Sequence, residues 1–273
     1  MRTIFNFCLW LIHFVKNTIR FGLPKKLPQS KEKIVICGNG PSLMKTNFDY
    51  FSSNGYQFAC VNYFALSEDL FFRIKPKYYC CIDPALFSAT PTDQTRKLFA
   101  ILERVDWDMV FIMPIGAKSN INNKNIKVVS INQNFMKNCP PKLQFSLYKK
   151  NLAIVGYQNV IIGALYYFIS MNVSEISLIG VETDFHRELF VGENNHVYRK
   201  CTHFYGEEVL DLQEKGEIKQ GELYLYFCFY YLTLYQYYVM AQYAQHMKVK
   251  VYNLCLNSFI DVFEKRAMQG GKL

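Results

Sequence analysis

The chain lacks the cysteine patterns that bind zinc or form a disulfide framework. Its nine cysteines are scattered along 273 residues, with no Cys-x-x-Cys and no cluster of His and Cys at the spacing of zinc ligands. Most of them lie in apolar runs, where a free cysteine behaves as a small hydrophobic residue. The odd, scattered count predicts a reducing compartment. We expect the adjacent Cys80 and Cys81 to belong to a strand core rather than to a redox pair.

No apolar run near the start of the chain is long enough to span a bilayer, which needs about 20 residues. No small-residue cleavage site follows the first apolar segment, so a signal peptide is not expected. Polar residues, among them Asn6, Asn17 and Arg20, fall on one side of a helical wheel and leave a wide apolar face. We therefore predict that residues 1–22 form an amphipathic, membrane-associating helix, with Trp10 at headgroup depth. A helix packed on its own domain is the alternative.

Acidic residues are almost missing from the first 33 positions, where Glu32 stands against seven Lys and Arg residues. This segment carries most of the formal net charge of +9, so the remainder of the chain is close to neutral. A basic arm on a near-neutral body indicates an anionic membrane surface as a partner rather than nucleic acid. Residues 23–32 are expected to be a basic linker between the helix and the main domain.

Short apolar runs that end in turn residues alternate with helical segments through the remaining chain. The Tyr-rich stretch 223–241 is predicted to be a core helix, because its seven tyrosine hydroxyls would be costly in hydrocarbon. The alternation predicts one α/β domain over residues 33–265, Rossmann-type, with a mostly parallel sheet and helices on both faces; residues 266–273 are a tail. Strands are expected at 34–37, 58–62, 78–82, 110–113, 128–131, 175–179 and 250–254, and helices at 159–171 and 220–247.

The first expected strand runs into Gly38-Asn39-Gly40-Pro41-Ser42. This is neither a Walker loop nor a complete Gly-x-Gly-x-x-Gly, because Leu43 takes the third glycine position. Glycines let the backbone approach a ligand, and the Asn and Ser side chains supply hydrogen bonds. Open α/β sheets bind nucleotides at such loops; an ordinary turn is the alternative. Because polar residues also follow other strands, we expect a small-molecule site at one sheet edge, formed with Asn62, Asp83, Glu182 and Asp184.

Taken together, these segments resemble the bacterial lipooligosaccharide sialyltransferases of glycosyltransferase family 42 and the related DUF115/MptE-like group. The resemblance runs in consistent order from about residue 33 to residue 265. It implies a GT-A-like single domain, a CMP-activated sugar donor, inverting transfer, no cofactor and no required metal. The segments that carry it are residues 34–43, Cys60-Val61-Asn62-Tyr63-Phe64, Cys81-Ile82-Asp83-Pro84-Ala85-Leu86-Phe87, Ser177-Leu178-Ile179-Gly180-Val181 and residues 251–258.

The resemblance also implies roles for individual residues. His203, in Thr202-His203-Phe204-Tyr205, matches the general base of a mobile lid, which we place around residues 183–220. His196 and His186 in the same segment are the alternative bases. Tyr198 matches a tyrosine that binds the departing phosphate, with Tyr205, Arg199 and Lys200 as further donors to it. The expected donor-binding positions are Gly38, Asn39, Gly40, Ser42, Asn62, Asp83, Gly163, Gly180, Tyr198 and Tyr205.

Three features depart from the sialyltransferase pattern. Asp83 replaces an Asn that contacts the donor, Ile162 stands where a donor-binding Ser is expected, and residues 192–198 have no close counterpart. A carboxylate facing an anionic CMP-sialate would be unfavourable unless it binds a hydroxyl. A different sugar or a different nucleotide is therefore compatible with the sequence.

We therefore predict a metal-independent glycosyltransferase that moves a sugar from a CMP donor to a hydroxyl of a bacterial surface glycan, such as lipooligosaccharide, O-antigen or capsule. It is expected at the cytoplasmic face of the inner membrane, acting on a glycan or glycolipid acceptor, with homo-oligomerisation left open. Two alternatives stand beside this prediction. One is an MptE-like, ATP-dependent pyrophosphokinase, in which Asp83, Glu182 and Asp184 would hold Mg²⁺. The other is a non-catalytic partner in glycan assembly.

Overall fold

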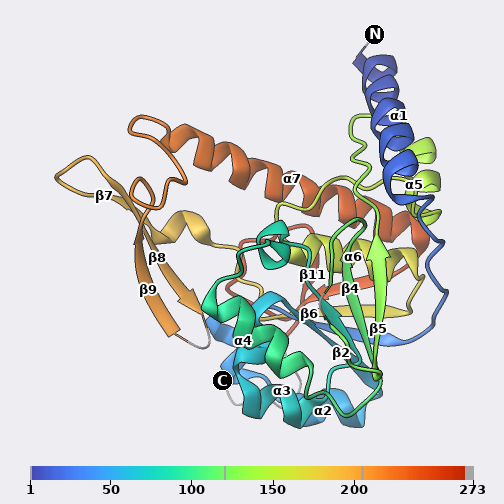
Figure 1. The fold of residues 1–273 in the computed structure, drawn as a ribbon, viewed down its shortest axis with the longest axis horizontal. Coiled ribbons are helices and arrows are strands. Elements are labelled where there is room, and N and C mark those ends of the chain that lie inside the picture. The colour runs from blue at the N-terminus through green and yellow to red at the C-terminus, as the bar shows by residue number, and fades with distance from the viewer. Residues whose placement is uncertain (1, 120, 204–205, 268–273) are drawn as a thin grey trace.

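Eight parallel strands form one sheet through the centre of the protein (Figure 1). The computed structural model describes residues 2–119, 121–203 and 206–267. The strand order is β11-β10-β6-β1-β2-β3-β4-β5, and every neighbouring pair is parallel. The predicted α/β class and parallel, Rossmann-like sheet are confirmed. The strands are β1 Lys33–Cys37, β2 Tyr56–Val61, β3 Tyr78–Cys80, β4 Met109–Pro114, β5 Ile126–Ile131, β6 Glu175–Ile179, β10 Lys250–Asn253 and β11 Glu264–Lys265.

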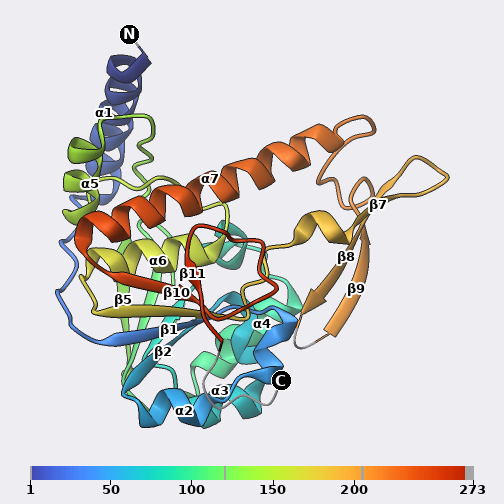
Figure 2. The same ribbon diagram turned by 180° about the vertical axis from the view of Figure 1, so that it is seen from behind.

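Helices cover both faces of this sheet (Figures 1 and 2), as the side chains of β1 illustrate. Ile34 and Ile36 pack on one face with α6 and α7, whereas Val35 and Cys37 pack on the other with α2, α3 and α4. This alternation follows from the two-residue period of a strand. The helices are α1 Arg2–Phe21, α2 Phe48–Ser53, α3 Glu68–Ile74, α4 Asp93–Leu102, α5 Pro141–Lys149, α6 Val160–Ser170 and α7 Leu223–Met247, with short 3₁₀ turns η1 Pro41–Lys45, η2 Asn62–Leu66, η3 Pro84–Phe87 and η4 Phe185–Glu188.

The predicted strands are all present, each within two residues of its expected bounds. The adjacent cysteines illustrate why the apolar runs were informative. Cys80 belongs to the core cluster on one face of the sheet and Cys81 to the cluster on the other, and both thiols are buried. Burial raises the pKa of the Cys81 thiol well above its ordinary value. The pair is strand core, as predicted.

The N-terminal helix α1 packs against the main domain along one side. Trp10 is only 6% exposed and belongs to the same core cluster as α6 and α7, with the rings of Phe7 and Phe14 beside it at 5.4 and 5.3 Å. Asn17 Nδ2 donates a hydrogen bond of 2.8 Å to Asn134 Oδ1. The expectation that Trp10 lies at lipid headgroups is therefore wrong, because the indole is part of the protein core. A second apolar side of α1 faces solvent, with Ile19 82% exposed.

The expected linker, residues 23–32, also lies against the domain. Leu27 is buried, Ser30 N donates to Met171 O at 2.8 Å, and Asn151 Nδ2 donates to Lys25 O at 2.8 Å. Among the described residues, no helix is both long enough and apolar enough to cross a bilayer.

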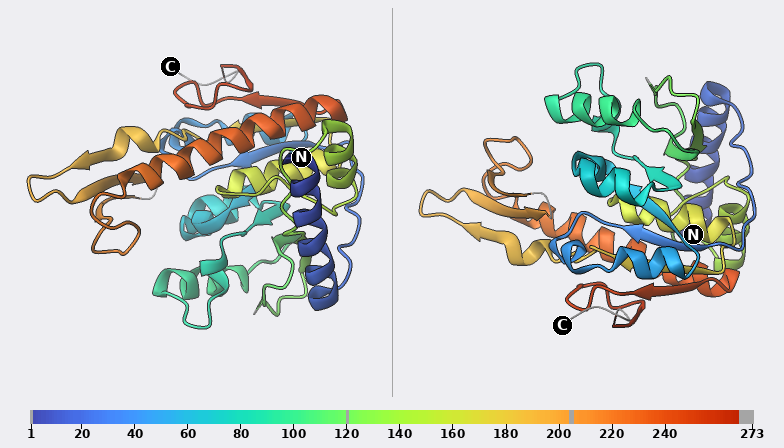
Figure 3. Two further views of the ribbon diagram at one scale, coloured as in Figure 1. Left: turned by 90° about the horizontal axis from the view of Figure 1, so that it is seen from above. Right: turned by 90° about the horizontal axis from the view of Figure 1, so that it is seen from below.

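A second, antiparallel sheet occupies most of the segment expected to be a lid. It contains β7 Leu189–Val191, β8 Val197–His203 and β9 Gly206–Asp211, and it projects to one side of the domain beside the start of α7 (Figures 1 and 3). From the sequence we expected a mobile lid here and predicted no strands. Its strands were missed because they are short and mix polar with apolar residues.

The docking of α1 predicts a specific loss of stability. Replacing Trp10 with Ala should lower the free energy of unfolding by about 3–5 kcal/mol, because it leaves a cavity in the main core. Ile19→Ala, on the exposed side of the same helix, should change it by no more than about 0.5 kcal/mol. Urea unfolding followed by circular dichroism measures both. Equal effects of the two substitutions would contradict this packing of α1.

Candidate functional site

The sheet has a switch point between β1 and β6. From β1 the chain proceeds outward through β2 to β5, and the later strands β6 and β10 are added on the other side of β1. Ligands of open α/β sheets bind in the crevice that such a reversal leaves at the carboxyl ends of the strands. A cavity of about 1100 Å³ occupies this position, between the ends of β1, β2, β3 and β6, the start of α6 and the middle of α7. Six of the predicted donor-site residues line it: Gly38, Asn39, Gly40, Asn62, Asp83 and Gly180.

The glycines of the first loop are explained by contact between two loops. Gly38 N donates to Ile179 O at 2.8 Å and Gly40 N donates to Gly180 O at 2.9 Å. A Cβ on Gly38 would overlap the carbonyl oxygen of Gly180, which itself has a positive φ of 62°. The absence of side chains therefore lets the β1 and β6 loops pack backbone to backbone. From the sequence, we expected these glycines to let the backbone approach a ligand instead.

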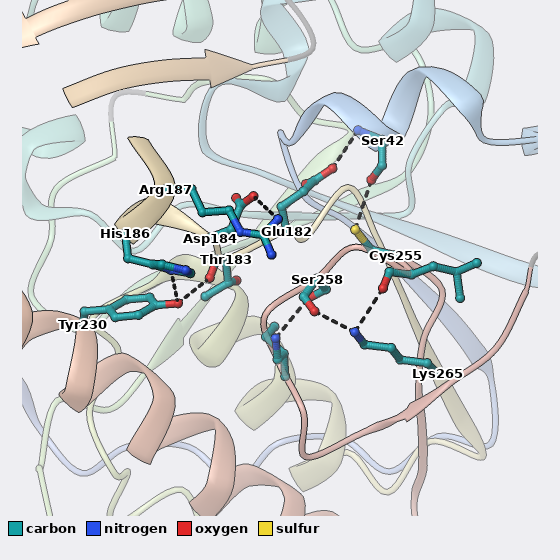
Figure 4. Close-up of polar contacts among 12 residues, drawn as sticks. Ser42, Glu182, Thr183, Asp184, His186, Arg187, Tyr230, Cys255, Ser258 and Lys265 are labelled. Carbon is teal, nitrogen blue, oxygen red and sulfur yellow. Dashed lines mark hydrogen bonds and ion pairs between the residues drawn. The ribbon is translucent and has the colours of Figure 1, made fainter. Parts of the chain in front are cut away.

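The Glu182 carboxylate lies at the start of η1, against the glycine loop (Figure 4). Ser42 N donates to Glu182 Oε1 at 2.7 Å. A Cβ on Gly40 would overlap Glu182 Oε2. Exposed backbone N–H groups at a helical start attract anions, and here a side chain of the protein supplies the negative charge. A ligand phosphate is therefore not expected at this loop.

Three buried oxygen atoms of the cavity residues have no hydrogen-bond partner among the described residues: Asn39 Oδ1, Asn62 Oδ1 and Glu182 Oε2. Asn39 follows β1, which lies between β2 and β6 in the sheet, so it is placed between Asn62 after β2 and Glu182 after β6. Its Nδ2 donates to Val61 O at 3.4 Å. Asn62 has the left-handed φ of 45° that Asn tolerates better than most residues. Each buried acceptor without a partner costs about 1–3 kcal/mol. A ligand that brings hydrogen-bond donors to this wall would recover that free energy.

Carboxylates outnumber cations around the cavity. Glu182, Asp184 and Glu188 follow β6, and the cations Lys137 and Arg199 come from the loop after β5 and from β8. Asp83 adds a fourth carboxylate, of which Oδ1 accepts a hydrogen bond of 2.9 Å from Ala85 N.

The two adjacent cations of β8 are separated by the alternation of the strand. Arg199 lines the cavity, where its Nη1 donates to Tyr226 Oη at 2.9 Å and its Nη2 lies 3.6 Å from Glu217 Oε1. Lys200 instead pairs with Glu207 at 2.7 Å. Of the expected pair, Arg199 is the residue that the fold brings to the cavity.

His186 lies beside the cavity segment without lining it. Tyr230 Oη donates its proton to Thr183 O at 2.9 Å, so the 3.1 Å contact between His186 Nδ1 and Tyr230 Oη must be donated by the histidine (Figure 4). In this arrangement His186 Nδ1 carries a proton and donates it to the tyrosine oxygen. Burial, and then the charge of Asp184, raises the pKa of Tyr230 to about 12. These contacts hold Thr183, which has a strained φ of 52° for a β-branched residue.

His196 and Tyr198 do not line the cavity. His196 Nδ1 lies 2.6 Å from Asp211 Oδ2 across the small sheet. Burial raises the pKa of Asp211, but hydrogen bonds from His196 and from the Gln213 and Glu214 backbone hold it below its ordinary value. The ring of Tyr198 stacks on that of Phe190 in β7, and its hydroxyl accepts a hydrogen bond of 2.9 Å from Asn194 Nδ2.

The remaining predicted residues have other placements. His203 is the last residue of β8 and its backbone pairs with Gly206, but its side chain lies outside the described residues, as does Tyr205. Ser42 and Gly163 lie beside the cavity without lining it. Ser42 Oγ is 3.3 Å from Cys255 Sγ, and a Cβ on Gly163 would be 2.6 Å from Ile82 Cδ1. Gly163 therefore allows α6 to approach the end of β3.

Gln236 is a cavity residue that the sequence analysis missed. Its Oε1 accepts a hydrogen bond of 2.8 Å from Gln158 N, and so it holds the loop before α6 against α7. A single amide in the apolar stretch of an expected core helix was the available signal, because buried polar groups need partners. Lys137 and Tyr235 also line the cavity, and no pattern in the sequence distinguished them.

Potential metal ligands are dispersed. The sequence contains one Asp-x-Asp, Asp106-Trp107-Asp108, but it precedes β4 at the opposite end of the sheet, where Asp106 pairs with Lys75 at 3.1 Å. Within the described parts of the chain, no three His, Cys, Asp or Glu side chains are grouped to hold a metal ion.

Comparisons with known proteins identify no relative. The chain has no significant match to a protein-family model, to a curated protein or to a solved structure. The cavity itself is therefore the feature from which a function can be inferred.

The contact between Gly40 and Glu182 predicts a coupled pair of substitutions. Gly40→Ala should destabilise the protein by about 1–3 kcal/mol, because the new Cβ must displace the carboxylate. In a Glu182→Ala background the same Gly40→Ala should cost much less, giving a coupling free energy of at least about 1 kcal/mol. Chemical unfolding of the four proteins of this cycle measures it. Simple additivity would show that the two residues do not meet as described.

Proposed function

We propose that this protein is a glycosyltransferase that binds a nucleotide-activated sugar in the switch-point cavity and transfers the sugar to a hydroxyl group. The observation that carries the proposal is a set of three buried acceptor oxygens that have no partner in the described part of the chain, at the position where α/β sheets bind nucleotides. The cavity volume of about 1100 Å³ lies at the upper end for small-molecule sites, which suits a nucleotide-sugar together with part of an acceptor.

The acceptor-rich wall suits the nucleoside part of the donor. Ribose hydroxyls and the exocyclic amine of cytosine are hydrogen-bond donors, and Asn39, Asn62 and Glu182 offer the complementary oxygens. Glu182 already occupies the anion position of the glycine loop, so the donor phosphate belongs elsewhere. Arg199 and Lys137 are the cations that line the cavity and could receive it.

Transfer also requires a base for the acceptor hydroxyl and stabilisation of a positively charged, oxocarbenium-like centre. His203 remains our proposed base, on the resemblance of its segment to the sialyltransferase lid. Of the carboxylates that line the cavity, Asp184 and Glu188 are the two closest in sequence to the His203 segment. Their negative charge suits the developing oxocarbenium centre, and either carboxylate could replace His203 as the base.

The pyrophosphokinase alternative retains one observation in its favour. Asp83, Glu182 and Asp184, the residues it would use for Mg²⁺, all line the same cavity. Two of them already accept backbone hydrogen bonds with one carboxylate oxygen. The experiment below separates this alternative from glycosyl transfer.

A thermal-shift panel of CMP, UDP, GDP and ATP, with and without Mg²⁺, tests the nucleotide class. We expect CMP to raise the melting temperature without Mg²⁺. Asn39→Ala and Glu182→Gln should each weaken CMP binding by about 10-fold or more, because a buried hydrogen bond to the ligand is lost. Asn122→Ala, an exposed amide outside the cavity, should leave the affinity unchanged. Stabilisation by ATP only when Mg²⁺ is present would favour the pyrophosphokinase instead.

The proposed base is tested by turnover of a CMP-sugar. His203→Ala should lower turnover by about 10²–10⁴-fold with little change in donor binding, and the acidic limb of the pH profile should disappear because the protonated imidazole is inactive. His196→Ala and His186→Ala are the matched controls and should cost far less. If Glu188→Gln or Asp184→Asn abolishes turnover while His203→Ala does not, the base is a carboxylate.

A further inference from the structure

Acidic residues are absent from three long stretches of the chain. Residues 1–31, 109–174 and 223–260 contain none of the 22 Asp and Glu residues but 15 of the 31 Lys and Arg residues. The body of the protein is therefore near neutral only as an average. Lys and Arg are spread along the whole chain, but every Asp and Glu lies outside these three stretches, so the three stretches carry the net positive charge and the rest of the chain is net negative.

Three of the elements from these stretches gather at one end of the molecule. Figures 1 and 2 show α1, α5 and α7 together, with α2 and α3 at the opposite end. In the view from that end, α1 and α7 both face the reader (Figure 3, left). Side-chain contacts join them to one another or to the same core. The ring of Phe145 on α5 packs at a tilt against those of Tyr243 and His246 on α7, each at 5.4 Å, and α1 buries Trp10 in the core shared with α7. The Lys and Arg residues on or next to these helices include Lys16, Arg20, Lys25, Lys26, Lys142, Lys149 and Lys150.

A stripe of exposed aromatic side chains runs along the outer face of α7. Tyr224, Phe227, Tyr231 and Tyr238 are spaced three, four and seven residues apart, which places them on one side of a helix. Tyr224 and Tyr231 are 63% and 65% exposed. No charged residue interrupts the helix from Leu223 to Gln245. Exposed aromatic side chains gathered on one face mark a contact surface rather than a face adapted to water.

The exposed side of α1 extends this apolar character at the same end of the molecule. Phe5, Leu9, Ile12, Val15 and Ile19 are all exposed, although the other side of the helix is packed on the core. Contact with a soluble carbohydrate would bury little of the apolar surface of these side chains. Aromatic rings on α7, apolar side chains on α1 and Lys or Arg residues on or next to α1 and α5 are the composition of a bilayer-facing surface, in which apolar groups enter the interface and Lys or Arg contact anionic headgroups.

We propose that α1, α5 and the outer face of α7 together rest on an anionic bilayer and set the cavity mouth at headgroup level. The inference extends to the substrate, and in that respect it rests on the proposed function. Phe135, Lys137, Leu232 and Tyr235 line the cavity and belong to α7 or to the loop that leads to α5. Tyr231 of the stripe stacks on Tyr235 at 6.3 Å, so the surface continues into the site. The acceptor is then a lipid-linked molecule that enters from the membrane.

Vesicle co-sedimentation with the full chain tests the surface without any assay of activity. We expect binding to phosphatidylcholine vesicles that contain about one-third phosphatidylglycerol, and weaker binding to phosphatidylcholine alone or at high salt. Replacing Tyr224, Phe227, Tyr231 and Tyr238 together with Gln should weaken partitioning by about tenfold or more. The matched control, Met44→Gln with Val209→Gln, replaces exposed apolar residues outside α1, α5 and α7 and should change nothing. Thermal unfolding of each variant confirms that it is folded.

Three outcomes would overturn the inference. Wild-type protein could fail to bind anionic vesicles, or the α7 variant could bind as well as the control. A wild type that is dimeric in light scattering, with the α7 variant monomeric, would show that a second copy covers this surface. Failure of the proposed function gives a different result from these three outcomes. Wild-type protein would still bind anionic vesicles, but CMP would raise the melting temperature of neither the wild type nor the α7 variant. If transfer does occur, a lipid-linked acceptor should be used at least tenfold better than its soluble headgroup, and the α7 variant should lose that preference.

Discussion

The cavity depends on the Glu182 carboxylate, which holds the loops after β1 and β6 together. One oxygen accepts the Ser42 backbone N–H, and the other lies where a side chain on Gly40 would be. Two backbone hydrogen bonds, from Gly38 and Gly40 to the end of β6, complete the contact. A charge of the protein thus occupies the anion position that most glycine loops keep for a phosphate. The rest of the cavity lining combines the acceptor oxygens of Asn39, Asn62 and Glu182 with two cations, one from β8 and one from the loop after β5.

Much of the fold was predictable because buried parallel strands leave a simple signature. Each appears as a short apolar run, such as Ile34–Cys37, that ends in glycine, proline or a polar residue. Since the carboxyl ends of parallel strands meet at one edge, the same reasoning brought together the polar residues that follow the strands, and all five line the cavity: Asn39, Asn62, Asp83, Glu182 and Asp184. The fold class and the location of the site are therefore consequences of local pattern.

What the sequence did not predict depends on contacts between distant residues. The reason for Gly40 lies at Glu182, and no local rule connects those positions. Strands β7, β8 and β9 form a separate sheet because they pair with one another, which short strands of mixed polarity do not reveal. In α1, a helical wheel identified apolar character but could not divide it into a side that packs on the domain and a side that does not. The burial of Trp10 was missed for that reason.

Helix α7 exposes aromatic side chains on its outer face and contributes side chains to the cavity wall. Tyr235, whose ring stacks on the exposed Tyr231, is followed directly by Gln236, whose amide anchors the loop before α6. The one helix of 25 residues contributes both to the exposed outer face and to the cavity wall. If a partner on the outer face displaces the helix, the cavity wall moves with it, and a ligand in the cavity then changes affinity for that partner by the same factor as the partner changes affinity for the ligand. Such a displacement of α7 would link binding at its outer face to binding in the cavity.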